Sequence, residues 1–539
     1  MSANLPITIA AASRLIEARR LSPVELVQDL LKRIESIDPV IDAFLLVTAE
    51  EAISQALKAE SEISKGGYRG TLHGIPFGLK DIYETAGIRT TGHSKVYANH
   101  VPKANATTVD KLYGAGAILM GKLATHELAH GGPSFDLPWP PARNPWNLEH
   151  FSGGSSSGSA AALAAGLVFG ALGSDTGGSI RTPSSLCGLA GIKPTFGLVS
   201  RHGVLPNCFS LDHCGPMART AEDCAILLSA IAGYDPNDRS SARGPQQDFR
   251  AGLRTDLKNV RVGVVRNFGE EDAVDNAELA GATEEALGVL QKLGARLHDV
   301  RLRSLRDYSD VWILIEEPET FAVQREVLIE RPEDFGSTFL ERTLIACLFQ
   351  GADYVRAQQE RSRLTSEMQA QLADCDVLVT AGAGPAPKLS PALAKWPIPH
   401  RFMPFSVTGN PAAVACSGFG KAGLPMSIQF VGKPFEDAKV LAIAHAYEKA
   451  TDWSQRRAVV SPEARPAPVA HKASATSISS VDPKIVDLCT RAAKSAGLNL
   501  PDGAFALLCH QAPNALEILA RIRAPRTFAE PASVFRFSA

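Results

Sequence analysis

Hydrophobic and polar positions divide the chain into segments of helical period and short apolar runs. From Leu26 to Ile34 apolar residues recur every three or four positions, which is the spacing of a helix with one buried face. Ser22, followed by Pro and then by Glu two positions later, is typical of a helix start. Runs such as 260–265 and 377–380 are rich in Val and are typical of buried strands.

Helical and strand-like segments alternate along most of the chain, which favours a layered α/β fold. Residues 304–375 are predicted to be mainly helical, and residues 402–409 to be a loop. The other predicted helices are 49–63, 107–114, 220–232, 277–294 and 437–450, and the predicted strands are 71–82, 117–122, 260–265, 296–300, 377–380 and 426–431.

One segment, 153–181, stands out because two Gly/Ser clusters flank an apolar run. The clusters are 153–159 (GGSSSGS) and 175–179 (DTGGS), and residues 160–172 between them are small and mostly apolar. The run predicts a buried helix followed by a buried strand, so both clusters are attached to rigid elements. A flexible linker, the usual interpretation of Gly/Ser-rich sequence, does not fit this setting, and we expect a rigid site here.

The second cluster has the features of a nucleophile loop. Gly177 and Gly178 lack Cβ, so the backbone beside Ser179 can turn sharply and expose its N–H groups. A serine hydroxyl with free N–H groups beside it suits acyl transfer, because those groups can stabilise an oxyanion. A short helix after Ser179, with Pro183 near its first turn, would add a favourable dipole.

A serine nucleophile needs a base, and no histidine lies between His150 and His202. Lys80 is the candidate, near the end of the apolar sequence GIPFGLKD at 74–81. Burial disfavours the charged form of a lysine, which lowers its pKa and makes it a competent base. The common state of a lysine is a solvated surface charge, and the apolar residues that flank Lys80 argue against that state.

Lys80 in GIPFGLKD, Ser155 in GGSSSGS and Ser179 in DTGGSIR resemble the three catalytic positions of the amidase signature family. This resemblance implies an α/β/α fold, in which a central mixed β-sheet lies between layers of helices. It also implies hydrolysis of amide bonds through an acyl-enzyme. The resemblance covers roughly residues 5–455 and includes three further motifs, KPT at 193–195, GPMART at 215–220 and GLP at 423–425.

The resemblance implies roles for individual residues. Lys80 is the base and acid, Ser155 relays the proton, and Ser179 is the nucleophile, with a cis peptide bond before Ser155. No cofactor and no metal ion is implied, and the substrate pocket is expected within 304–410. The remaining candidate site residues are the backbone N–H donors to the oxyanion, Thr176, Gly177, Gly178 and Ser179, and a bracing pair, Asp175 and Arg181.

A second motif competes with this interpretation. His126, Glu127 and His130 match the HExxH pattern of zinc proteases. That pattern needs a continuous helix, and the sequence Gly-Gly-Pro at 131–133 stops a helix at once. We therefore favour a loop that lies beside the site and shapes its pocket over a zinc protease.

Composition limits the expected partners and location. The 539 residues are 45% hydrophobic and 21% charged, with a formal net charge of −2, so no strong attraction to nucleic acid or to a membrane surface is expected. The nine cysteines are scattered, which favours free thiols in a reducing compartment. A cytoplasmic enzyme with a small-molecule amide substrate is the expectation, and a homodimer is left open.

The C-terminal part differs in composition from the rest. It begins with a stretch rich in Pro, Ala and Ser and continues with a helix that ends at Gly497 and a helix over 503–523, which we expect to be broken or kinked at Pro513. The helices resemble the small subunits that accompany some amidases, such as the C subunit of glutamyl-tRNA amidotransferase and the small partner of carboxybiuret hydrolase. The expected division is a catalytic domain at 1–455, a linker at 456–480 and a small helical module at 481–539 that docks on the catalytic domain.

Two enzyme functions fit these features. The first is a serine amidohydrolase that cleaves the C–N bond of a small amide or urea-derived substrate on Ser179. The second is the A-type subunit of a tRNA-dependent amidotransferase, in which the same residues release ammonia from glutamine for a partner protein. The fused module favours the first, because it replaces a separate small subunit. The presence of Lys80, Ser155 and Ser179 disfavours an inactive binding protein.

Overall fold

The computed structural model describes residues 8–244, 247–268, 276–394, 400–469 and 477–524. An eleven-stranded sheet crosses the molecule in the order β1-β3-β2-β6-β8-β7-β12-β13-β11-β9-β10. A separate pair, β4 (Arg143–Asn144) and β5 (Asn147–Phe151), lies outside it. The strands of the large sheet are β1 (Phe44–Val47), β2 (Pro76–Lys80), β3 (Ile118–Leu123), β6 (Gly170–Asp175), β7 (Ala190–Lys193), β8 (His213–Ala218), β9 (Arg261–Val265), β10 (Arg296–Val300), β11 (Val377–Ala381), β12 (Ala412–Phe419) and β13 (Pro425–Val431).

The sheet is mixed, and its parallel part positions the candidate site. Strand β2 runs parallel to both β3 and β6, whereas β6 and β8 are antiparallel. Leu79 of β2 is level with Leu172 of β6. Because parallel strands end at the same edge of a sheet, the last residues of β2 and β6, Lys80 and Asp175, lie at one edge.

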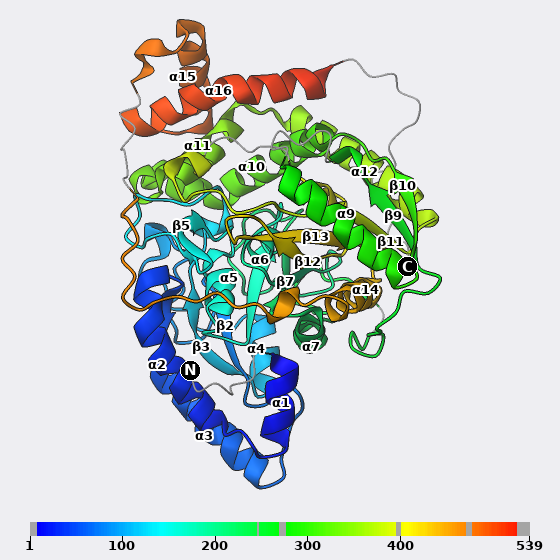
Figure 1. Ribbon diagram of the computed structural model, residues 1–539. Helices are drawn as coiled ribbons and strands as arrows, with labels where there is room; N and C mark the ends of the chain where they lie inside the picture. Colours follow the sequence, from blue (N-terminus) through cyan, green and yellow to red (C-terminus); the bar gives the residue numbers. More distant parts are fainter. Residues whose placement is uncertain (1–7, 245–246, 269–275, 395–399, 470–476, 525–539) are drawn as a thin grey trace.

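Helices cover both faces of the sheet (Figure 1). On β11 the side chains of Val377 and Val379 join one hydrophobic core, and Leu378 between them joins the other. The predicted α/β/α architecture is therefore confirmed. The helices are α1 (Ile9–Glu17), α2 (Pro23–Ile41), α3 (Ala49–Ser64), α4 (Thr107–Gly114), α5 (Ser157–Ala164), α6 (Arg181–Leu186), α7 (Ala221–Ile231), α9 (Ala277–Lys292), α10 (Leu305–Glu330), α11 (Ser337–Thr343), α12 (Gly351–Ala373), α13 (Met403–Val407), α14 (Asp437–Lys449), α15 (Pro483–Ala496) and α16 (Asp502–Arg523). None of the described helices has the length and apolar content needed to cross a membrane.

Local sequence signals place several of these helices correctly. Ser22 caps α2 by accepting hydrogen bonds from Val24 and Glu25, and Leu26, like Ile34, is buried. Thr220 caps α7 in the same way. Gly497 ends α15 in the left-handed conformation, which favours glycine.

Three predictions of local structure were wrong or incomplete. Residues 402–409 were expected to be a loop but contain the short helix α13, which Pro404 begins because proline fits the first turn of a helix. Strand β12 was not predicted. The last helix, α16, is not broken at Pro513, because it runs continuously from Asp502 to Arg523; a kink there stays a prediction.

The C-terminal helices pack on the side of the molecule formed by α10, α11 and α12 (Figure 1). Their buried residues belong to the same hydrophobic core as those of α10 and α12. Arg521 forms an ion pair with Asp310 of α10 at 2.6 Å, and Arg523 pairs with Asp353 of α12 at 2.6 Å. The division at residues 455 and 480 stays a prediction.

Candidate active site

Lys80 is fully buried at the end of β2 and bonds to two serines. Its Nζ donates to Ser155 Oγ at 2.7 Å and to Ser174 Oγ at 2.8 Å. Burial lowers the pKa of Lys80 to about 7, although the carboxylates of Asp212 and Asp175 act in the opposite direction. A large fraction of the amine is therefore neutral near pH 7 and can accept a proton.

Ser155 lies in the first Gly/Ser cluster, just before α5, and is buried. The peptide bond between Gly154 and Ser155 is cis, as the family resemblance implied. The backbone carbonyl of Ser155 accepts a hydrogen bond from the His126 N–H at 3.0 Å. A Cβ added at Gly154 would lie 2.0 Å from the His126 ring, so the ring and the cluster are packed as closely as a glycine allows.

Ser179 lies in the turn between β6 and α6 and is partly exposed, unlike Lys80 and Ser155. The two Gly/Ser clusters meet here, because the Ser156 N–H donates to the Ser179 carbonyl at 3.3 Å. The hydrogen bonds among the described residues join Lys80 to Ser155, but none joins the hydroxyls of Ser155 and Ser179.

The backbone beside Ser179 has free donors. None of the N–H groups of Gly177, Gly178 and Ser179 donates a hydrogen bond to another described residue. Gly178 has φ +145°, and a Cβ there would lie 2.9 Å from the Cβ of Phe402, so the turn depends on glycine. Free donors held in a tight turn are what an oxyanion site requires.

Asp175 and Arg181 brace this turn from within the core. Arg181 donates from Nε and Nη2 to the two carboxylate oxygens of Asp175, both at 2.9 Å. Burial would raise the pKa of Asp175, but the Arg181 guanidinium outweighs it and holds that pKa below its usual range. The remaining Arg181 donors bond to the Phe402 carbonyl, Gln429 Oε1 and Ser406 Oγ.

The residues of the HExxH motif do not form a zinc site. Glu127–Ala129 form a 3-10 turn in which Leu128 and Ala129 have positive φ, so no continuous helix presents the two histidines together. His126 Nδ1 contacts the Gly131 carbonyl, and burial lowers the pKa of His126 to about 3. Glu127 accepts hydrogen bonds from Ser94 and Gly336, and His130 points toward α10. The zinc-protease interpretation is therefore wrong, because the chain turns where that motif needs a helix.

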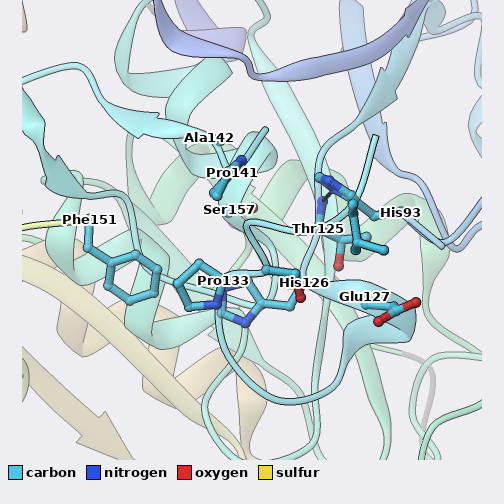
Figure 2. Close-up of a pocket in the computed structure, with 11 residues that line it drawn as sticks. His93, Thr125, His126, Glu127, Pro133, Pro141, Ala142, Phe151 and Ser157 are labelled. Atoms are coloured by element: carbon cyan, nitrogen blue, oxygen red, sulfur yellow. Dashed lines mark hydrogen bonds between the residues drawn. The ribbon is translucent and has the colours of Figure 1, made fainter. Parts of the chain in front are cut away.

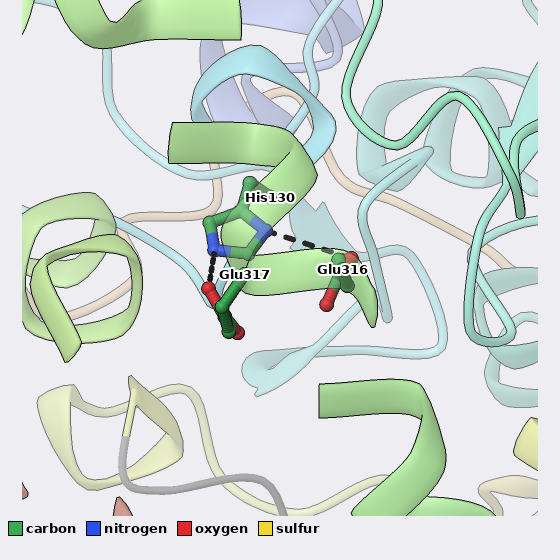
Figure 3. Close-up of side chains that lie close together, drawn as sticks. All are labelled: His130, Glu316 and Glu317. Carbon is green, nitrogen blue, oxygen red and sulfur yellow. Dashed lines mark ion pairs between the residues drawn. The ribbon is translucent and has the colours of Figure 1, made fainter. Parts of the chain in front are cut away.

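His130 belongs instead to a buried charge cluster, in which it faces Glu316 and Glu317 (Figure 3). Arg342 completes the cluster by pairing with both carboxylates. His130 Nε2 lies 3.0 Å from Glu317 Oε2, and its Nδ1 lies 3.5 Å from Glu316 Oε1. Burial lowers the pKa of His130, but Glu317 and Glu316 outweigh it and raise that pKa to about 9. Arg342 donates to both carboxylates, so two cations balance two anions.

This cluster is the one group of possible metal ligands found among the described residues, with His130, Glu316 and Glu317 offering atoms within 4.8 Å of one another. Both carboxylates already bond to Arg342, so the described arrangement is that of an ion-pair network.

A small cavity adjoins the first Gly/Ser cluster (Figure 2). Its volume of about 10 Å³ suits one water molecule. Three of its lining residues, Thr125, His126 and Ser134, have a buried polar atom without a hydrogen-bond partner among the described residues. Such atoms are the usual partners of a buried water.

Sequence reasoning missed three features of the site. Ser174, the second partner of Lys80, directly precedes the DTGGS cluster, and its place on a strand parallel to β2 is the signal that could have found it. Trp312, Glu316 and Glu317 come from α10 and Arg342 from α11, whereas His130 comes from the loop of the HExxH motif, and the sequence does not indicate that these segments meet. The adjacent acids Glu316 and Glu317 in an otherwise apolar stretch were the only hint.

Comparison with known proteins identifies relatives over most of the chain. Residues 25–441 match the family model named Amidase. The chain is 36% identical over 479 residues to the A-type subunit of glutamyl-tRNA(Gln) amidotransferase from Chloroflexus aggregans, and the match covers 84% of this chain and 98% of that protein.

Two solved structures resemble the fold closely. One comes from work on a vestigial protein complex and the evolutionary origins of an s-triazine catabolic enzyme, with TM-score 0.77, 29% identity and coverage of 82% of this chain and 98% of that chain. The other is the native peptide amidase of Stenotrophomonas maltophilia, with TM-score 0.74, 29% identity and coverage of 82% and 98%.

Proposed function

This chain belongs to the amidase family of enzymes that hydrolyse carbon–nitrogen bonds, and we propose that it does so through an acyl-enzyme on Ser179. Neutral Lys80 takes a proton from Ser155 as Ser155 takes one from Ser179, and Ser179 Oγ attacks the amide carbon. The C–N bond breaks, and the amine leaves with the proton returned through Ser155. Water then hydrolyses the ester by the same route in reverse.

One observation carries this proposal: a fully buried lysine whose amine donates to Ser155 and pairs with no carboxylate among the described residues. Such a lysine is poised to exchange a proton near neutral pH, as a general base must be. The free N–H groups of Gly177, Gly178 and Ser179 supply the oxyanion donors that the attack requires.

The substrate we favour is a small, uncharged amide or urea-derived molecule. The turn that holds Ser179 is bordered by Trp312 at Gly177 and by Phe402 and His400 at Gly178. Burial lowers the pKa of His400 to about 4, so its ring is neutral. The structural relative associated with s-triazine catabolism supports a small nitrogen-rich substrate.

A second candidate is the A-type subunit of a tRNA-dependent amidotransferase. Curated relatives at 36–37% identity bear that name, and the match to one of them extends over 98% of its length. In that role the same residues would hydrolyse glutamine and pass ammonia to a partner. The sequence relatives favour this candidate, whereas the additional helices α15 and α16 favour the first.

Ammonia release from a panel of amides tests both functions. The purified chain alone should hydrolyse at least one small amide or urea derivative faster than it hydrolyses glutamine. A fluorophosphonate should label Ser179, and Ser179→Ala should abolish labelling and hydrolysis. Turnover of glutamine alone, increased by a co-purified protein partner, would support the second candidate. An active Ser179→Ala protein would contradict the shared mechanism.

A further inference from the structure

We propose that Trp312 is a positioning residue for the oxyanion donors and that the charge cluster of His130, Glu316, Glu317 and Arg342 holds Trp312 in place. The proposal rests on the function proposed above, because it assigns a task to the peptide groups beside Ser179. None of these five side chains belongs to the motifs at Lys80, Ser155 and Ser179.

Trp312 contacts the turn at the first of its peptide groups. The indole Nε1 donates to the Thr176 carbonyl at 3.1 Å, and the side chain is only 6% exposed. A Cβ added at Gly177 would lie 2.7 Å from Cζ2 of the ring, so the ring packs directly on the backbone of Gly177. Hydrogen bond and packing together leave this peptide group little freedom to rotate.

The geometry of a peptide explains why this contact matters for an oxyanion. The Thr176 carbonyl and the Gly177 N–H belong to one planar trans unit, in which they point in opposite directions. A donor that holds the carbonyl on one side therefore aims the N–H at the other side. Trp312 thus fixes the direction of a candidate oxyanion donor without touching the substrate's reacting atoms.

The charge cluster also contacts the indole, through Arg342. The guanidinium carbon of Arg342 lies 5.4 Å from the centre of the Trp312 ring, which is the arrangement of a cation–π contact. Arg342 bonds to Glu317 Oε1 at 2.7 and 3.0 Å, and His130 holds the other oxygen of Glu317. A guanidinium with its partners fixed in this way cannot leave the ring without breaking buried ion pairs.

A second connection leads from the cluster to the same turn. Asn207 Nδ2 donates to Glu316 Oε1 at 3.1 Å and to Thr176 Oγ1 at 3.5 Å. The Thr176 hydroxyl itself donates to Asp212 at 2.6 Å. The turn is therefore attached to the cluster through both the backbone and the side chain of Thr176.

The test is Trp312→Phe, which keeps an aromatic ring on Gly177 and removes the indole donor. We expect kcat to fall about 10–100-fold with KM changed less than about 2-fold, since losing an oxyanion donor outright costs about 10²–10³-fold. A boronic acid or aldehyde analogue of the best substrate forms a tetrahedral adduct and uses the same donors. Its Ki should rise by the same factor as kcat/KM falls.

Trp146→Phe is the matched control. Trp146 Nε1 also donates to a backbone carbonyl, that of Cys187 at 2.8 Å, and takes no part in the Ser179 turn. This variant should keep the wild-type kcat and Ki. Glu317→Gln weakens the ion pair that holds Arg342. It should also lower kcat, by a smaller factor than Trp312→Phe does.

Three results would overturn the proposal: an unchanged kcat in Trp312→Phe, a loss confined to KM, or a Ki for the analogue that does not follow kcat/KM. Fluorophosphonate labelling of Ser179 in the wild-type protein distinguishes a wrong positioning role for Trp312 from a wrong acyl-enzyme mechanism. If Ser179 is labelled while Trp312→Phe behaves as wild type, the positioning role is wrong and the acyl-enzyme mechanism stands.

Discussion

The site contains two fully buried basic side chains, Lys80 and Arg181, whose hydrogen-bond partners differ. Lys80 bonds to two serine hydroxyls and pairs with no carboxylate among the described residues. Arg181 bonds to both carboxylate oxygens of Asp175 and to three further acceptors. Burial without an opposite charge favours a neutral amine, whereas burial with one favours a stable ion pair.

This difference fits the two residues to the different tasks that we propose for them. A group that exchanges protons must be able to exist in both protonation states near the working pH, as Lys80 can with a pKa of about 7. Arg181 keeps its charge and thereby fixes the turn that carries Ser179.

Replacing Lys80 should have the largest effect. Lys80→Met is expected to reduce kcat/KM by about 10²–10⁴-fold, because proton transfer by a positioned base contributes on that order. Lys80→Arg should be equally inactive, since a guanidinium does not deprotonate in proteins. Circular dichroism checks that both variants fold, and substantial turnover by either would identify another base.

Replacing Arg181 should mainly lower the stability of the folded protein. Arg181→Met leaves Asp175 buried and unpaired, and we expect the free energy of unfolding to fall by about 3–5 kcal/mol in denaturant titration. Arg261→Met, which breaks a solvent-exposed ion pair with Asp376, should leave the free energy of unfolding almost unchanged. Equal losses in the two variants would mean that Asp175 is not paired as described.

The wild-type pH profile should show the titration of Lys80. Below its pKa of about 7 the amine is increasingly protonated and has no lone pair to accept a proton. We expect kcat/KM to fall about tenfold per pH unit, to about one hundredth of its plateau at pH 5. A profile that stays flat to pH 5, measured on protein that remains folded, would exclude Lys80 as the titrating base.

Giving Lys80 a carboxylate partner, as Arg181 has, should stabilise the charged form of its amine. Ser174→Asp puts an anion where Lys80 now finds a hydroxyl at 2.8 Å, and an opposite charge at that distance raises a lysine pKa by about 1–3 units. The acid limb of the pH profile should move to higher pH, with about 5–500-fold lower activity at pH 7 for a shift of that size. Ser174→Asn has the same shape without the charge and should leave the limb in place, so a limb shifted equally in both variants would refute the electrostatic explanation.

Local sequence patterns predicted the individual helices and strands better than the contacts between them. Helix caps at Ser22 and Thr220 and the apolar strand that ends at Lys80 are encoded within a few residues, and the structure has each of them. The short helix α13 and strand β12 were not predicted, because their stability depends on packing between distant segments.

The residues of the candidate site were likewise predictable only where a local sequence motif contains them. Lys80, Ser155 and Ser179 were recognisable because they lie in sequence motifs. Trp312 of α10 contacts the Ser179 turn, and Arg342 of α11 contacts Trp312. Helical spacing alone does not reveal which helix face meets which loop. The charge balance around His130 likewise depends on four side chains from three segments.

The bonds of Arg181 also constrain when the enzyme becomes active during biosynthesis. Its acceptors come from Asp175, Phe402, Ser406 and Gln429, the last 248 positions along the chain. All three motif residues have been synthesised by residue 179, yet the support beneath the turn is complete only when β13 has formed. Because contacts this distant form late, a nascent chain that already contains Lys80, Ser155 and Ser179 is expected to remain inactive until nearly the whole catalytic sequence has left the ribosome.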